Sequence, residues 1–177
     1  MSEIAAGKVY LRPLCGDDLD RLLGWHNDPE LYATLAGHFR PVAREVEQEW
    51  LQRRMAAADE LNLAICLSDS AEHVGNIYLR DINRQNLNAE LHIFIARPEH
   101  RGHGYGGLAV RLITKYAFEE LGLARLYLHV LASNFSAIKT YEACGFAKEG
   151  TLRGHVFKNG VFEDLVIMGL RNERRSG

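Results

Sequence analysis

Residues 97–107 read RPEHRGHGYGG, so four of the last six residues in this stretch are glycines. The apolar run LHIFIA precedes it at residues 91–96, and LAVRLITKYAF follows at residues 108–118 with apolar residues at helical spacing. A glycine turn that opens a helix leaves backbone N–H groups unpaired, and the helix dipole adds partial positive charge there. The stretch therefore predicts a phosphate-binding turn between a strand and a helix.

Two common phosphate-binding motifs do not fit this turn. Gly102, Gly104 and Gly107 satisfy the G-x-G-x-x-G spacing of dinucleotide-binding folds. In those folds the first glycine closely follows the strand, whereas residues 97–101 intervene here, and the later strand ends in Val-Leu rather than an acidic residue. No Lys-Ser or Lys-Thr pair follows the glycines, which excludes a Walker loop. The turn is therefore expected to bind a diphosphate other than a dinucleotide or a Walker-loop nucleotide.

Length and composition indicate one globular domain spanning residues 1–177, with a loose tail at residues 171–177. The chain has 177 residues, of which 47% are hydrophobic and 25% charged, enough to bury a core. A formal net charge of -2 gives no general attraction to nucleic acid or to an anionic membrane. We therefore expect no nucleic-acid partner and no membrane association.

The cysteines indicate a reducing compartment. Cys15, Cys66 and Cys144 are odd in number, widely spaced and flanked by apolar residues, a pattern typical of buried free thiols. The start of the chain lacks the apolar stretch of a signal peptide, and no apolar run approaches membrane-spanning length. The sequence therefore predicts a cytoplasmic protein.

The order of the predicted elements indicates an α/β (α+β) fold. Three strands joined by polar turns predict an antiparallel meander, the helix after the glycine turn predicts one parallel step, and the Asn-Gly pair at residues 159–160 predicts a final hairpin. The expected sheet is mixed but mostly antiparallel. The predicted strands cover residues 9–11, 61–67, 74–80, 88–96 and 126–130 and flank residues 159–160, and the predicted helices run from Asp17 or Asp18 to about residue 27, over residues 42–58, from the glycine turn to residue 121, and over residues 134–143.

Two motifs resemble those of the GNAT N-acetyltransferases. Arg101, Gly104 and Gly106 match the pyrophosphate loop R/Q-x-x-G-x-G/A of that family, and NFSAIKTYEACGF at residues 134–146 matches its N-x-x-A-x-x-x-Y-x-x-x-G-F segment. With the opening VYLRPLCGDDL and the close GTLRGHVFKNGVFEDLVIMGL, the resemblance covers essentially the whole chain and points to the branch of ribosomal-protein alanine and spermidine acetyltransferases. It implies a sheet of about seven strands, flanked by about four helices and splayed near its middle to admit acetyl-CoA.

The resemblance also implies how acetyl-CoA binds as co-substrate. The N–H groups of residues 102–107 would take the pyrophosphate, while the Arg101 guanidinium either contacts phosphate or caps the loop. Asn134 would bind the pantetheine arm, cap a helix, or do both. The expected acetyl-CoA residues are Phe94, Ile95, Ala96, Arg101, Gly102, His103, Gly104, Tyr105, Gly106, Gly107, Asn134, Ser136 and Tyr141.

Acetyl transfer to an amine needs a base, a polarised carbonyl and an acid for the departing thiolate. By the resemblance, Tyr141 is the acid. Glu90 is a candidate base acting through water, and His92 competes with it, because alternation along the strand places both on one face. A backbone N–H near residues 94–96 would polarise the carbonyl.

The sequence is less informative about the acceptor. The segment GWHNDPELY looks like the W-x-N-x-P segment of enzymes that acetylate nucleotide amino sugars, although packing and a helix break explain it equally well. Glutamates and arginines alternate on residues 44–54, as on a solvated helix face. We therefore rank an amino sugar or a protein N-terminal amine above a polyamine. A non-catalytic acetyl-CoA-binding module is the rival class, a homodimer is possible, and the histidine spacing predicts no metal site.

Overall fold

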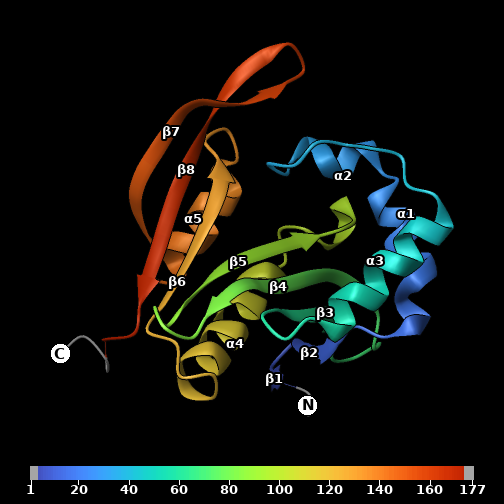
Figure 1. The fold of residues 1–177 in the computed structure, drawn as a ribbon, viewed down its shortest axis with the longest axis horizontal. Coiled ribbons are helices and arrows are strands. Elements are labelled where there is room, and N and C mark those ends of the chain that lie inside the picture. Colours follow the sequence, from blue (N-terminus) through green and yellow to red (C-terminus); the bar gives the residue numbers. More distant parts are fainter. Residues whose placement is uncertain (1–3, 174–177) are drawn as a thin grey trace.

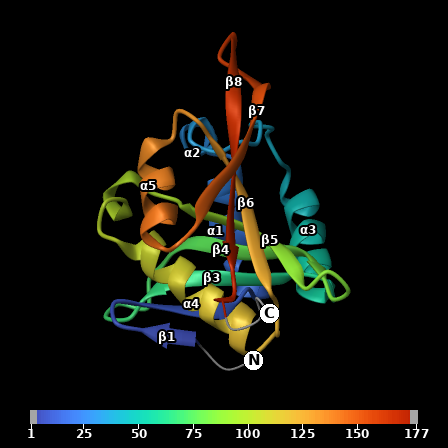
Figure 2. The same ribbon diagram turned by 90° about the vertical axis from the view of Figure 1, so that its left-hand side faces the viewer.

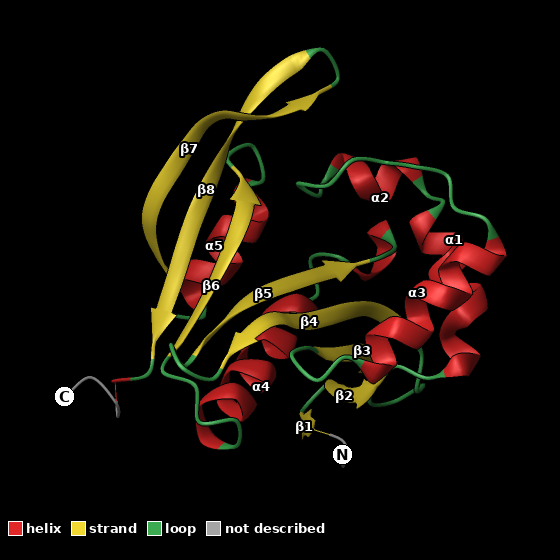
Figure 3. Ribbon diagram, viewed as in Figure 1, coloured by secondary structure: helices red, strands yellow, loops and turns green. Residues whose placement is uncertain are grey.

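The computed structural model describes residues 4–173 and contains one mixed sheet with helices on both faces (Figures 1 and 3). The strands are β1 (Ile4–Ala6), β2 (Val9–Pro13), β3 (Leu61–Leu67), β4 (His73–Asn83), β5 (Asn88–Ile95), β6 (Arg125–Leu131), β7 (Ala147–Lys158) and β8 (Val161–Arg171). The helices are α1 (Leu19–His26), α2 (Pro29–Ala33), α3 (Arg44–Ala56), α4 (Tyr105–Glu119) and α5 (Phe135–Ala143), with short 3₁₀ turns η1 (Gly16–Asp18) and η2 (Pro98–His100).

The eight strands lie in the order β1-β2-β3-β4-β5-β6-β8-β7, and only the pair β5–β6 is parallel. This parallel pairing covers three residue pairs, from Asn88↔Arg125 to Glu90↔Tyr127. Beyond them, β5 stays paired with β4 and β6 stays paired with β8, so the two strands diverge as the arms of a V (Figure 1). The sheet is therefore open along one side in its middle, and we call this opening the splay.

The two faces of the sheet carry separate cores. One core packs α4 and α5 against apolar side chains such as Ile77, Leu91 and Leu128. The other packs α1, α2 and α3 against Tyr78 and Phe94 (Figure 2). Because successive side chains of β5 point to opposite faces, the strand contributes to both cores.

A buried polar chain fixes the start of α1 to the second face. Arg12 donates two hydrogen bonds to Asp18, at 2.8 and 2.7 Å, and Asp18 Oδ1 lies 3.1 Å from His73 Nδ1. His73 Nε2 lies 2.7 Å from Asn76 Oδ1, and Asn76 in turn donates to the Tyr78 hydroxyl at 2.7 Å. Burial alone would raise the pKa of Asp18, but the hydrogen bonds from Arg12 and His73 hold it well below its usual range. These contacts thus tie β2 and the start of α1 to β4.

The predicted fold class is confirmed, with differences in detail. The sheet has eight strands rather than seven, because Ile4–Ala6 adds a strand too short for alternation to reveal, and α2 adds a short helix after the predicted break. β8 reaches Arg171 and the N–H of the next residue donates to Ala124 O, so the first residues of the predicted tail are held, while residues 174–177 lie outside the described part. Cys66 is buried but Cys15 is exposed, so the buried-thiol prediction is wrong for Cys15. No helix among residues 4–173 has the length and hydropathy needed to cross a bilayer.

Gly75 lets β4 and β5 approach closely where the splay is widest. A Cβ atom at this position would lie 2.2 Å from Phe94 O and 3.0 Å from Ile95 Cα, both on the backbone. Backbone atoms in a paired strand cannot move aside without breaking the ladder. A side chain here would therefore displace the arm of the splay formed by β5.

We expect Gly75→Ala to lower the free energy of unfolding by roughly 2 to 3 kcal/mol, the usual cost of overpacking. Gly24→Ala is the matched control, because no atom lies within 4 Å of its added Cβ and alanine favours the helix by about 0.5 to 1 kcal/mol. Denaturant unfolding of both variants measures the difference. Equal stability of the two variants would contradict the close approach.

Candidate active site

The edge of β5 that faces the splay offers unpaired backbone groups. The Ala96 N–H donates to Val74 O at 2.9 Å, and Phe94 O points toward Gly75 on β4. Since backbone groups alternate in direction along a strand, the N–H of Ile95 faces the splay. Of the three residues predicted to polarise the carbonyl, Ile95 is thus the one with an available N–H, and its contact with acetyl-CoA stays a prediction.

The glycine turn forms a row of free amides at the mouth of the splay. Gly102 and Gly104 have φ of 79° and 81°, values that residues with a side chain rarely adopt. The first hydrogen bond of α4 runs from Leu108 N to Gly104 O at 3.1 Å, and no backbone N–H of residues 102–107 donates a hydrogen bond within the described chain. No atom lies within 4 Å of a Cβ built at either glycine, so nothing obstructs an approaching ligand. These features fit a pyrophosphate.

Arg101 fastens this turn to the end of β5. Its Nε donates to Ile95 O at 3.0 Å and its terminal nitrogen donates to Ala96 O at 2.8 Å. Of the two roles left open by the sequence, the geometry favours the cap, because the guanidinium is engaged with backbone carbonyls. His103 Nε2 lies 3.1 Å from Glu99 O, and its ring stacks on Tyr105 with centroids 5.6 Å apart.

Glu90 stands at the vertex of the splay, with a histidine on each arm. Its Oε1 lies 2.6 Å from His129 Nδ1 on β6, a contact that crosses the splay. Its Oε2 lies 3.2 Å from His92 Nε2 on β5, close enough for an ion pair but without hydrogen-bond alignment. Contacts with His92 and then His129 lower the pKa of Glu90 to about 2, against the opposing effect of burial. The carboxylate is therefore ionised at neutral pH.

Sequence reasoning predicted Glu90 and His92 but missed His129. The signal was present, because alternation along residues 125–131 puts His129 and Tyr127 on the same face. Both Glu90 and Tyr127 belong to the last parallel pair, so His92 and His129 occupy equivalent positions two residues beyond it. The sequence does not show how many residues of β5 and β6 pair, so it does not bring His129 next to Glu90.

Tyr141 approaches from the other face of the sheet. It lies on α5, its side chain is only 9% exposed within the first core, and its ring centroid is 6.0 Å from that of Phe146. Burial raises the pKa of its hydroxyl, so the phenol keeps its proton at neutral pH. The hydroxyl has no hydrogen-bond partner among the described residues and is not sealed from solvent. Its O–H is thus not engaged within the described residues and can donate a hydrogen bond.

Asn134 begins α5 and also joins it to α2. Its Oδ1 accepts from Ala137 N at 3.1 Å, the helix-cap role considered from the sequence, and its Nδ2 donates to Thr34 O at 3.1 Å. Ser136, in the first turn of α5, has an exposed side chain. Contacts of both residues with acetyl-CoA stay predictions.

The segment from Tyr32 to His38 contacts the β7–β8 hairpin and the end of β6. Lys158 near the hairpin tip donates to the carbonyls of Tyr32 and Leu35, and His38 Nε2 lies 2.9 Å from Phe157 O. Its Ala36 packs on the small apolar cluster of Leu131, Val156 and Leu165. This segment therefore joins the region after α2 to the hairpin.

The segment GWHNDPELY, which favoured an amino sugar as acceptor, is engaged in packing and hydrogen bonds within the protein. Trp25 is buried at 8% exposure, Asn27 exchanges two hydrogen bonds with the backbone of Val42, and Asp28 caps α2 with Pro29 in its first turn. The alternative explanation, packing and a helix break, accounts for this motif.

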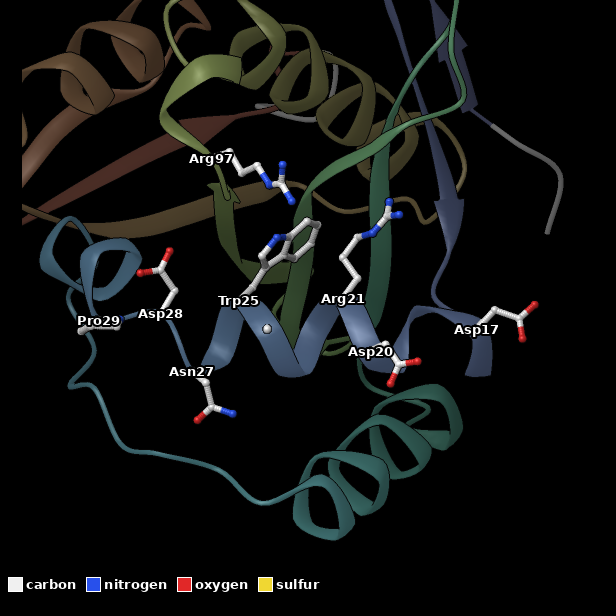
Figure 4. Close-up of a pocket in the computed structure, with 9 residues that line it drawn as sticks. Asp17, Asp20, Arg21, Trp25, Asn27, Asp28, Pro29 and Arg97 are labelled. Carbon is white, nitrogen blue, oxygen red and sulfur yellow. The ribbon is translucent and has the colours of Figure 1, made fainter.

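A pocket of about 680 Å³ lies along α1, away from Glu90 and Tyr141. Figure 4 shows Arg97 reaching from the segment after β5 toward Trp25, with Asp17 and Asp20 at the other end of the pocket. Its wall has charged groups of both signs but none of the groups on the splay. This pocket is therefore distinct from the splay.

Comparison with known proteins agrees with this geometry. A family model described as an acetyltransferase (GNAT) domain matches residues 8–147. The chain is 33% identical over 138 residues to a spermidine N(1)-acetyltransferase of Vibrio cholerae serotype O1, covering 71% of this chain and 79% of that protein. It is 37% identical over 97 residues to the spermidine N(1)-acetyltransferase of Escherichia coli K12, covering 55% and 52%.

A solved structure is similar over nearly the whole chain. It is the spermidine N-acetyltransferase from Vibrio cholerae in complex with CoA and spermine, with a TM-score of 0.86, 27% identity, and coverage of 93% of this chain and 95% of that one. The substrates named for these relatives are polyamines, not the amino sugar or N-terminal amine that the sequence ranked first. That ranking relied on Trp25, Asn27 and Pro29, whose roles here are structural, and on the alternating charges of residues 44–54.

We expect Gly104→Val to weaken acetyl-CoA binding at least tenfold, because a β-branched side chain would stand among the free amides. Gly160→Val is the matched control, since Gly160 has φ of 79°, open space around its Cβ and a place in the distant β7–β8 turn. Calorimetric titration of both variants separates lost binding from backbone strain. Equal acetyl-CoA affinities of the two variants would contradict binding of the pyrophosphate to the glycine turn.

Proposed function

Because the chain belongs to the GNAT acetyltransferase family, we propose that this acetyl-CoA-dependent N-acyltransferase passes the acetyl group directly to a primary amine inside the splay. The observation that carries the proposal is that the β5–β6 pairing ends at Glu90 and Tyr127, while the glycine turn beyond the other end of β5 has free amides. The pyrophosphate of acetyl-CoA would bind those amides, and its thioester would lie between the arms.

The sheet divides the chemistry between its two faces. An amine arrives as an ammonium ion and must lose a proton, because only the neutral nitrogen is nucleophilic. We place that step on the face of Glu90. The nitrogen then attacks the carbonyl carbon, a C–N bond forms, and the Ile95 N–H is placed to stabilise the oxyanion.

Tyr141 acts on the opposite face as the general acid. The nitrogen of the tetrahedral intermediate loses a second proton, the C–S bond breaks, and the thiolate accepts the Tyr141 hydroxyl proton. One of the two amine protons returns to the tyrosine through solvent and the other is released. Amide, free thiol and one proton are the products, so the reaction balances.

Polyamines are the first acceptor class to consider. Two of the similar proteins are spermidine acetyltransferases and another is a putative ribosomal N-acetyltransferase, and Glu90 places a negative charge where a cationic amine would arrive. Protein N-terminal amines and nucleotide amino sugars remain second, without a structural feature that favours them.

We expect spermidine to release thiol from acetyl-CoA faster than an N-terminal alanine peptide or a nucleotide amino sugar. A panel containing these three amines and spermine, assayed at equal concentration, ranks the acceptors. A faster rate with the peptide or the amino sugar would replace the polyamine as acceptor but leave the transferase reaction standing. Thiol release with none of them would leave the proposed activity without support.

We expect Tyr141→Phe to lower turnover roughly 10²- to 10⁴-fold, the usual contribution of a general acid, with acetyl-CoA affinity nearly unchanged. The defect should shrink as pH rises toward the thiol pKa, about 8 to 9, where the thiolate leaves without help. Tyr116→Phe, on α4, is the control and should keep normal turnover. Near-normal turnover of Tyr141→Phe would exclude its hydroxyl as the acid.

A further inference from the structure

His129 and Glu90 form a dyad across the vertex of the splay. The contact of 2.6 Å between Nδ1 and Oε1 joins the two arms where backbone pairing has ended. Nδ1 is thereby occupied, and the carboxylate fixes the tautomer, as in other histidine–carboxylate pairs. His129 Nε2 has no partner among the described residues and is not buried, and the side chain is 29% exposed. Nε2 of His129 therefore has a lone pair that can accept a proton from a group that enters the splay.

We propose that the His129 imidazole is the general base that takes the proton from the acceptor ammonium, with Glu90 as its positioning residue. This inference rests on the proposed function and revises the sequence prediction that Glu90 itself is the base. His129 Nε2 accepts one N–H proton of the ammonium, and the electron pair of that bond stays on nitrogen for the attack. The imidazolium is then stabilised by the Glu90 carboxylate and returns its proton to solvent.

The properties of the two groups favour this division. A carboxylate with a pKa of about 2 is a poor proton acceptor at neutral pH, because general bases work best near the working pH. Imidazoles titrate near neutrality. Glu90 is also engaged by both histidines and only 17% exposed, so it offers an amine less access than His129 does.

The charged and titratable groups that face His129 come from three strands. Glu90 and His92 face it from β5, and Tyr127 meets it edge-on from its own strand with ring centroids 6.0 Å apart. Its cross-strand partner on β8 is the apolar Ile167. Arg80 lies opposite Glu90 on β4, beyond the carboxylate. Glu90 is therefore the only carboxylate among these groups.

His92 is the competing candidate, but its geometry is less suitable. It meets Glu90 through Nε2, at 3.2 Å and poorly aligned, and its side chain is 41% exposed. Its contact with the carboxylate is thus longer and less well aligned than that of His129. Substitution of each histidine separates the two candidates.

The test measures thiol release from acetyl-CoA between pH 6 and pH 10, with the fastest amine of the panel above. We expect His129→Gln to lower kcat/KM at pH 7 at least 10²-fold and to shift the rise of rate to higher pH, with unchanged acetyl-CoA affinity. Added imidazole should restore part of the activity to His129→Gly but not to Glu90→Gln. His155→Gln, at an exposed position on β7, controls for loss of a histidine and should keep the wild-type profile.

Two results would overturn the proposal. One is a His129→Gln variant with a wild-type pH profile and kcat/KM within fivefold of wild type. The other is a His92→Gln variant that loses the neutral-pH rise in rate while His129→Gln keeps it. Both presuppose a wild-type enzyme that turns over, so they differ from failure of the proposed function, in which wild type itself releases no thiol.

Discussion

The β5–β6 pairing ends after three residue pairs, and the rest of the site depends on this short contact. A longer pairing would consume the backbone groups that now face the splay and would leave no room for a thioester. The opening survives because each arm is held on its other side, β5 by β4 and β6 by β8. Arg101 holds the end of the β5 arm by hydrogen bonds to Ile95 O and Ala96 O, and Gly75 allows β4 to pack closely against it.

The splay also brings together groups that the sheet would otherwise separate. Glu90 and His129 lie on the face of α1 to α3, whereas Tyr141 lies in the core on the face of α4 and α5. Their electrostatic surroundings differ accordingly. Contacts with histidines keep the Glu90 carboxylate ionised, while burial keeps the Tyr141 phenol protonated. The opening thus has the Glu90–His129 pair on one side and a protonated phenol on the other, which is the arrangement that the proposed reaction needs.

The sequence predicted those parts that depend on local pattern. The glycine turn, the crossing helix and the alternation of β5 are local, and their positions agree with the structure. The strand Ile4–Ala6 was missed because three residues are too few to show alternation. His129 was missed because its partner, Glu90, lies 39 residues away in the sequence. The acceptor ranking depended in part on Trp25 and Asn27, which have tertiary partners that a motif does not reveal.

Amide hydrogen exchange with and without acetyl-CoA tests most directly the claim that the splay and its glycine turn hold the co-substrate. Free amides exchange rapidly, and a bound pyrophosphate and thioester would protect them. The account predicts slower exchange at residues 102–107 and at Ile95, with little change in the β7–β8 turn. Protection confined to the α1 pocket, or none at the glycine turn under saturating acetyl-CoA, would contradict it.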